Sequence, residues 1–211
     1  MVVAIVVLAL AIAGAAAAVV VTRGSGGSTT ASEQANAAAP RGSSSGKASP
    51  KLLTGSGGQP TGGLPTETYS GQSFSISYPK GWQIQSAEQE KGGYFDTTFV
   101  SGADPNMLLR VDYTPNDATD PMQAAQTVVN AVQRQPGYQQ LDLSRGTFNG
   151  FPAAHWEFTV PEGGITLHKE DEFFTDTANN ASVAVLTQAP QSQYSGLANQ
   201  LARLRRSLTM K

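Results

Sequence analysis

The sequence contains no cysteine. This absence excludes disulfide bonds, thiolate zinc sites, cysteine nucleophiles and a lipid anchor attached through a cysteine. Charge is also scarce, since only 14% of the residues are Asp, Glu, Lys or Arg. From Tyr69 to the C-terminus there are 14 acidic residues against 10 basic ones, which gives this part a net charge of −4. Because a nucleic-acid-binding surface needs a basic face, we expect no nucleic-acid partner.

Two common catalytic signatures are missing as well. The sequence contains neither the His-Glu-x-x-His motif of zinc hydrolases nor the Gly-x-Gly-x-x-Gly fingerprint of dinucleotide-binding folds. We therefore expect a protein that is not an enzyme and that needs no cofactor. A binding or structural role has to be sought in the organisation of the chain.

The chain opens with 21 residues that carry no charged side chain and are mostly Val, Ala, Ile and Leu. As a helix rising about 1.5 Å per residue, this segment is long enough to cross the roughly 30 Å hydrocarbon layer of a membrane. We predict a transmembrane helix over residues 1–22, the signal anchor of a single-pass protein of the cell membrane. A cleavable signal peptide is the alternative, because the small residues Ala13, Ala15 and Ala17 are compatible with a cleavage site.

The sequence gives two conflicting indications of the side of the membrane on which the rest of the chain lies. Arg23, Arg41 and Lys47 follow the apolar run, and the positive-inside rule places such basic residues in the cytoplasm. A long polar tether, in contrast, is typical of a domain held outside the membrane. We expect an extracytoplasmic domain; a start codon upstream of Met1, with basic residues before the apolar run, would reconcile the two features.

Ser, Gly, Ala, Thr and Pro dominate residues 23–68, where Leu52, Leu53 and Leu64 are the only large aliphatic residues and aromatic residues are absent. Such a segment buries too little apolar surface to offset the conformational entropy lost on ordering. We predict a disordered linker over residues 23–68 and one globular domain over residues 69–211.

Strands are predicted in the C-terminal part by alternation of apolar and polar residues. Phe74, Ile76 and Tyr78 alternate with serines, which is the pattern of a half-buried strand. The hairpin signal Pro-Glu-Gly-Gly at residues 161–164 joins two of the later candidates. Further strands are predicted over residues 82–86, 94–100, 107–113, 138–146, 153–160, 165–174 and 181–188.

Two helices are predicted among these strands. Asp120 is a typical N-cap, Pro121 favours the first helical position, and this helix is expected to end near Gln135. After Pro190, apolar residues recur at spacings of three and four, which indicates an amphipathic helix. These residues are Tyr194, Leu197, Leu201, Leu204 and Leu208. The order of elements predicts an α+β fold, in which an antiparallel sheet of about six to eight strands is flanked by two main helices.

Three arginines interrupt the acidic character of this region. Arg203, Arg205 and Arg206 lie near the end of the last predicted helix. Cations at a helix C-terminus interact favourably with the helix dipole, so we interpret these residues as structural.

These elements together resemble the Mog1/PsbP-like fold. The resemblance rests on the opening strand "FSISYPKGW", the helix after Asp120-Pro121, the segment "GTFNGFPAAHWEFTV" and the closing amphipathic helix. More narrowly, the chain is similar to exported or membrane-anchored domains of actinobacteria, including the extracellular part of some receptor-type Ser/Thr kinases. The resemblance implies a domain that binds partners without catalysis. No kinase motif accompanies it, since the sequence has no His-Arg-Asp and no Asp-Phe-Gly.

One group of polar residues in the predicted hairpin has the side chains required for metal or acid–base chemistry. If residues 161–164 form the turn, the register pairs Glu157 with His168. The same register pairs His155 with Glu170 and puts all four side chains on one face. Two imidazoles and two carboxylates at cross-strand distance suit a zinc site or an acid–base pair. The alternative is a set of cross-strand polar pairs with a purely structural role.

Three interpretations of function stay open at this point. The first is a membrane-tethered, extracytoplasmic domain without catalytic activity that contacts a protein or cell-envelope component through a groove between sheet and helix. The second is a metal-binding domain, or a metal-dependent enzyme, that uses His155, Glu157, His168 and Glu170. The third is a structural or assembly factor whose domain spaces other components.

Overall fold

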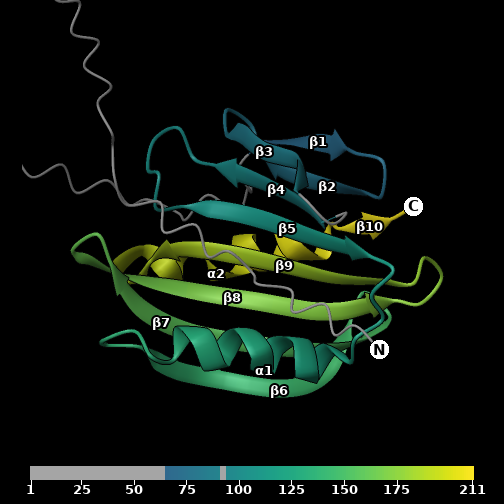
Figure 1. The fold of residues 1–211 in the computed structure, drawn as a ribbon. Helices are drawn as coiled ribbons and strands as arrows, with labels where there is room; N and C mark the ends of the chain where they lie inside the picture. Colours follow the sequence, from purple (N-terminus) through teal and green to yellow (C-terminus); the bar gives the residue numbers. More distant parts are fainter. Residues whose placement is uncertain (1–64, 91–93) are drawn as a thin grey trace, which may run out of the picture. The chain divides into compact units, whose positions relative to one another are not determined.

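The computed structural model describes residues 65–90 and 94–211 (Figure 1). The helix predicted for residues 1–22, and all but the end of the linker predicted for residues 23–68, lie outside the described residues. Within the described part of the chain, no helix combines the length and the hydropathy that a membrane span requires. The transmembrane anchor therefore stays a prediction.

Seven antiparallel strands form the main sheet, in the order β3-β4-β5-β9-β8-β7-β6 (Figure 1). The strands are β3 (Gln83–Glu90), β4 (Tyr94–Val100), β5 (Leu108–Pro115), β6 (Gln139–Phe148), β7 (Phe151–Glu162), β8 (Ile165–Asp176) and β9 (Ala181–Pro190). Their side chains alternate between the two faces, so each face buries its own apolar set. The predicted class, α+β with an antiparallel sheet and two helices, is confirmed.

A second sheet has three strands in the order β1-β2-β10. They are β1 (Thr66–Ser70), β2 (Phe74–Pro79) and β10 (Thr209–Met210). Only β2 was predicted, and β1 begins inside the segment that was expected to be linker up to residue 68. Its side chains are mostly exposed, so no apolar alternation marks it in the sequence. β10 is two residues long and pairs with β2, from which it is separated by most of the domain.

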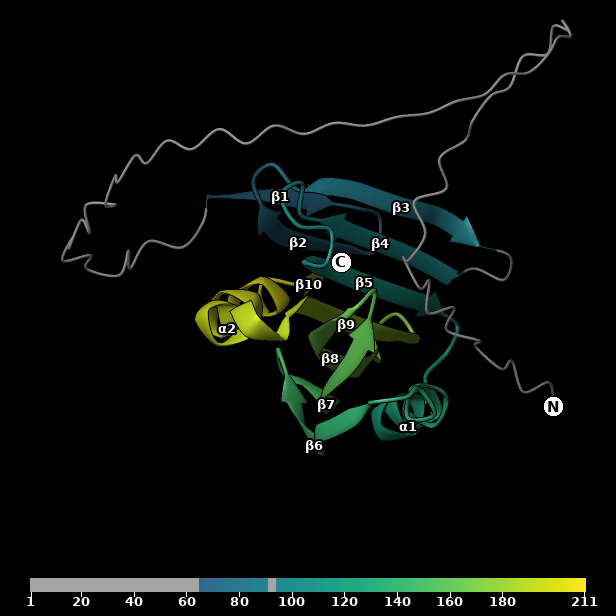
Figure 2. The same cartoon turned by 90° about the vertical axis from the view of Figure 1, so that its left-hand side faces the viewer.

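Helices α1 (Pro121–Val132) and α2 (Gln191–Arg206) cover opposite faces of the main sheet (Figure 2). The Asp120 side chain accepts a hydrogen bond from the Gln123 backbone N–H at 3.1 Å, so the predicted N-cap is confirmed. The helix ends at Val132 and continues only as a turn to Gln135. Its buried face packs on Ala154, Trp156, Phe158, Val160, Phe173 and Ala184.

Helix α2 packs on the other face, together with strand β2 of the small sheet. Of the predicted apolar stripe, Tyr194, Leu201, Leu204 and Leu208 are buried, while Leu197 is partly buried. Phe74, Ile76 and Tyr78 of β2 are buried in the same core, as their alternation indicated. The core therefore joins the two sheets and α2 into one packed unit.

The β7–β8 hairpin has a tighter turn than predicted. Gly163 and Gly164 alone form the loop, with φ angles of 59° and 85°, and Glu162 pairs with Ile165. Two consecutive residues with positive φ are typical of the two-residue turns that suit the twist of antiparallel strands. Val160 consequently faces Leu167, so the predicted register is wrong by two residues. A shift of two leaves every side chain on its predicted face.

Candidate functional site

The four polar residues singled out in the hairpin all lie on the face of the sheet that α2 covers. His155 and Glu157 come from β7, and they alternate with Trp156 and Phe158, which face α1. His168 and Glu170 come from β8. The predicted common face is therefore confirmed. The predicted cross-strand partners are wrong, because Glu157 lies opposite Glu170 and His155 lies opposite Glu172.

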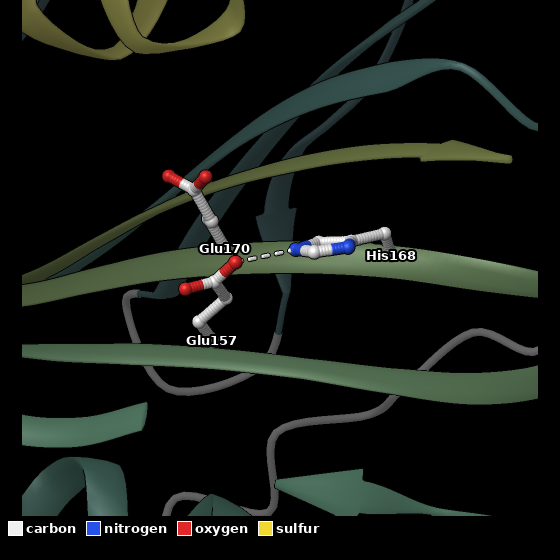
Figure 3. Close-up of side chains that lie close together, drawn as sticks. All are labelled: Glu157, His168 and Glu170. Atoms are coloured by element: carbon white, nitrogen blue, oxygen red, sulfur yellow. Dashed lines mark hydrogen bonds and ion pairs between the residues drawn. The ribbon is translucent and has the colours of Figure 1, made fainter. Parts of the chain in front are cut away.

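Glu157, His168 and Glu170 form a Glu–His–Glu cluster (Figure 3). The Nε2 atom of His168 lies 2.7 Å from Oε1 of Glu157, a diagonal contact across the two strands. One ligand-type atom from each of the three residues lies within 4.8 Å of the others. His168 is buried, whereas 29% of the Glu157 side chain is exposed, so the cluster has one side open to solvent.

The His168 ring is fixed by two residues of α2. Its Nδ1 atom lies 2.9 Å from Oε1 of Gln191. The ring also stacks on Tyr194, with a distance of 3.4 Å between the ring centroids and an interplanar angle of 5°. Neither contact was predicted, because sequence patterns do not show which side chains of a helix meet a given strand.

His155 does not belong to the cluster. Its Nδ1 atom lies 2.8 Å from Oε1 of Glu172, and this contact raises the pKa of His155. The predicted pairing of His155 with Glu170 is therefore wrong. Three of the four predicted residues therefore form the cluster, and the fourth, His155, pairs with Glu172 instead.

A buried arginine of α2 contacts the cluster. Arg205 forms an ion pair with Glu170 and donates a hydrogen bond to the Thr187 hydroxyl of β9. Arg205 is 4% exposed, whereas Arg203 and Arg206 are exposed in the last turn of α2. The interpretation of all three arginines as partners of the helix dipole missed this contact. Arg205 points into the protein and ties the helix to the sheet.

Burial acts on both members of this ion pair. Burial and the nearby Glu157 carboxylate raise the pKa of Glu170 to about 7. Burial lowers the pKa of Arg205 to about 10, so Arg205 is charged at neutral pH. The ion pair favours the charged form of each side chain and opposes both shifts. The pKa of Glu170 is raised because the effect of burial is larger than that of its ion pair with Arg205.

A second buried acid lies on the opposite face of the sheet. Asp171 of β8 is 4% exposed, and its cross-strand neighbours are Trp156 and Leu186. Its Oδ1 atom has no hydrogen-bond partner among the described residues. Burial, reinforced by the carboxylate of Asp112, raises the pKa of Asp171 to about 8. This residue was not singled out by any sequence pattern.

A groove of about 620 Å³ lies between the turn that joins β1 to β2 and strands β4 and β5. We call it the aromatic groove. It is lined by Tyr69, Ser70, Gly71, Gln72, Ser73, Phe74, Phe95, Thr97 and Tyr113. The groove expected from the sequence was one between sheet and helix, whereas this one lies between the two sheets. Its parts come from three segments far apart in the chain, so no local pattern predicts it.

The turn that forms one wall of the aromatic groove is held by the end of the chain. The backbone N–H of Lys211 donates to the Ser73 carbonyl at 3.0 Å. The Nζ atom of Lys211 donates to the Ser70 hydroxyl and to the Gly71 carbonyl, at 2.9 and 2.6 Å. A Cβ atom at Gly71 would lie 2.8 Å from Cε1 of Tyr69, so a larger residue there would displace the Tyr69 ring.

Residues 68–207 match the family model of the serine/threonine kinase C-terminal domain. The chain belongs to this family. Both the aromatic groove and the Glu–His–Glu cluster of this kinase C-terminal domain lie inside the matched residues. No curated protein matches the chain.

The domain is similar to several solved structures. CyanoP, the PsbP protein of the cyanobacterium Synechocystis sp. PCC 6803, superposes with a TM-score of 0.54 at 16% identity, covering 75% of this chain and 99% of CyanoP. LpqN of Mycobacterium tuberculosis gives 0.48 at 16% identity, over 70% and 91% of the two chains. The Ran-binding protein Mog1p of Saccharomyces cerevisiae gives 0.47 at 11% identity, over 69% and 95%. The superposition with CyanoP shows that the fold is Mog1/PsbP-like, as the resemblance implied.

Proposed function

We propose that this protein is a membrane-tethered, extracytoplasmic binding domain that has no catalytic activity of its own and contacts a protein or cell-envelope component. The aromatic groove is the single observation that carries the proposal. Its volume of about 620 Å³ falls within the usual range of ligand pockets. Membership of the kinase C-terminal domain family supports an accessory role. The predicted anchor and linker support a tethered position outside the cytoplasm.

The aromatic groove has the surface chemistry of a recognition site. Phe95 and Tyr69 are only partly buried, although each packs against other rings of the domain. Aromatic side chains supply a large contact area at little conformational cost, because only two side-chain torsions have to be fixed. A recess that keeps such rings partly accessible offers a ligand more burial than a flat surface would.

The location is tested with protease added to intact cells that express the full chain. We expect the domain to be digested while a cytoplasmic marker protein stays intact. Protection of the domain until the cells are lysed would refute the extracytoplasmic position.

The binding role is tested by sedimentation of the full chain with isolated cell envelopes. Because the predicted anchor also holds the protein in membranes, the envelopes are first washed with detergent to remove the membrane. The measurement is the fraction of each variant that sediments with these washed envelopes. We expect Phe95→Ala in the aromatic groove to reduce retention. Phe151→Ala is the matched control, since Phe151 is a partly buried aromatic residue outside the groove. Equal retention of both variants would refute a role for the groove.

A second candidate function is divalent metal binding by the Glu–His–Glu cluster. The observation that favours it is the close approach of three ligand-type atoms, together with Gln191, which orients the His168 ring as partners of metal-bound histidines do. The positive charge of Arg205 beside Glu170 opposes it.

Zinc titration of the full chain, monitored by the melting temperature, tests whether the cluster binds metal or has only a structural role. Metal binding predicts a rise in melting temperature that His168→Asn abolishes and His155→Asn retains, because His155 lies outside the cluster. If zinc leaves the melting temperature unchanged, the metal function is rejected.

A further inference from the structure

We propose that the aromatic groove binds a neutral oligosaccharide. This inference rests on the proposed binding function and names the chemical class of the ligand. It follows from four properties of the groove: its rings, its lack of charge, the pairing of the backbone in its floor and the hydroxyl groups of its lining.

Aromatic rings form both the floor and one wall of the groove. Phe95 of β4 and Tyr113 of β5 are directly opposite cross-strand neighbours, with 6.1 Å between their ring centroids. Tyr69 of β1 approaches from the other side and packs on Phe74, with ring centroids 5.5 Å apart. Ring faces pack well against the apolar C–H faces of sugar rings, because both surfaces are flat and weakly polar.

None of the residues that line the groove carries a charge at neutral pH. Recognition of an acidic sugar, a phosphate or a carboxylate needs a cation or a cluster of N–H donors. The nearby cation, Lys211, is already engaged by the Ser70 hydroxyl and the Gly71 carbonyl. The lining therefore fits a ligand without net charge.

The backbone of the groove floor, on β4 and β5, is already paired on both sides, which disfavours an extended peptide added there. Thr97 pairs with β3 on one side and β5 on the other, and Tyr113 pairs with β4 and β9. In the turn, the Ser73 carbonyl accepts from Lys211 and the Gly71 N–H donates to Phe74. An extended peptide binds by adding a strand to an open sheet edge. The floor of this groove offers no such edge.

Side-chain hydroxyl groups remain for polar recognition. Tyr69 and Tyr113 bring two phenolic hydroxyl groups to the lining of the groove. A phenolic hydroxyl both donates and accepts, which matches the dual character of sugar hydroxyls. Thr97 and Ser73 add two more hydroxyl groups to the lining. A lining of aromatic rings and hydroxyl groups without charge is complementary to a neutral sugar chain.

The test is isothermal titration calorimetry of the full chain with three neutral probes, maltohexaose, cellohexaose and chitohexaose. A galacturonic acid hexamer and a proline-rich decapeptide serve as comparison ligands. We expect one neutral probe to bind and Phe95→Ala to weaken it about tenfold. Tyr113→Phe keeps the ring and removes the hydroxyl, so it should weaken binding by a smaller factor without unfolding the domain. Phe151→Ala should leave the affinity unchanged.

Each outcome decides the inference. Binding of a neutral probe that weakens in both groove variants supports it. Absence of binding by all three neutral probes, or binding that Phe95→Ala and Tyr113→Phe leave unchanged, overturns it. If the peptide or the acidic sugar binds in a groove-dependent manner, the ligand class is wrong while the binding function stands. If envelope retention is also independent of Phe95, the proposed function itself fails.

Discussion

Replacing Asp171 with Asn should remove a large part of the pH dependence of stability. The folded state raises the pKa of Asp171 to about 8 from the ordinary 3.8. Between these two values the folded protein holds a proton that the unfolded chain releases. The stabilising contribution is therefore complete below about pH 4 and is lost as the pH rises through about 8. Asn cannot ionise and has nearly the same shape, so the variant lacks this loss.

The magnitude follows from the linkage between proton binding and unfolding. One proton held only by the folded state changes the unfolding free energy by about 1.4 kcal/mol per pH unit. For a group that is half ionised at about pH 8, the change between pH 6 and pH 8 is about 2 kcal/mol. We expect the unfolding free energy of Asp171→Asn, relative to the wild type, to rise by this amount over the same interval.

The assay is urea unfolding of the full chain at pH 6 and pH 8, followed by tryptophan fluorescence and far-UV circular dichroism. Trp156 is the cross-strand neighbour of Asp171 and reports on the same face of the sheet. Asp142→Asn is the control, because Asp142 lies on the edge strand β6, where its carboxylate accepts a hydrogen bond from Ser144. If wild type and Asp171→Asn lose the same stability between the two pH values, the reasoning is refuted.

Two other substitutions test the packing of the domain. Arg205→Met leaves Glu170 buried without its cation and should lower the unfolding free energy by about 3 kcal/mol. The control Arg206→Met, on the exposed side of the helix, should change the unfolding free energy little. Equal effects of the two substitutions in urea unfolding would contradict a stabilising role of the ion pair. Gly164→Ala forces a Cβ onto a residue with φ of 85° and should lower the unfolding free energy by about 1 kcal/mol. Gly146→Ala is its control, since a Cβ meets no atom within 4 Å at either glycine, whereas only Gly164 of the two has a positive φ. Similar melting temperatures for the two variants would contradict the role of backbone strain in the turn.

The sequence was most informative in strands, where the alternation of side chains determines which residues share a face. In β7 and β8, alternation alone placed His155, Glu157, His168 and Glu170 on one face. The register was missed because it depends on which two of four turn residues adopt positive φ, and Pro-Glu-Gly-Gly allows more than one loop length. The error of two residues changed the partners and preserved the face.

Contacts between distant segments were beyond the reach of such patterns. Arg205 follows Leu201 by four residues and so lies beside the apolar stripe, but its partners Glu170 and Thr187 come from strands that no helical pattern identifies. Strand β1 escaped detection because most of its side chains are exposed, and β10 because it has two residues. The aromatic groove combines parts of β1, β4 and β5, so it exists only once the two sheets have packed.

The hydrogen bonds from Lys211 to the β1–β2 turn connect the groove to the last strand of the domain. A molecule that immobilised this turn would slow the opening of β10 as well. The amides of residues 209–211 would then exchange with deuterium more slowly in the occupied protein, although no atom of the bound molecule touches them.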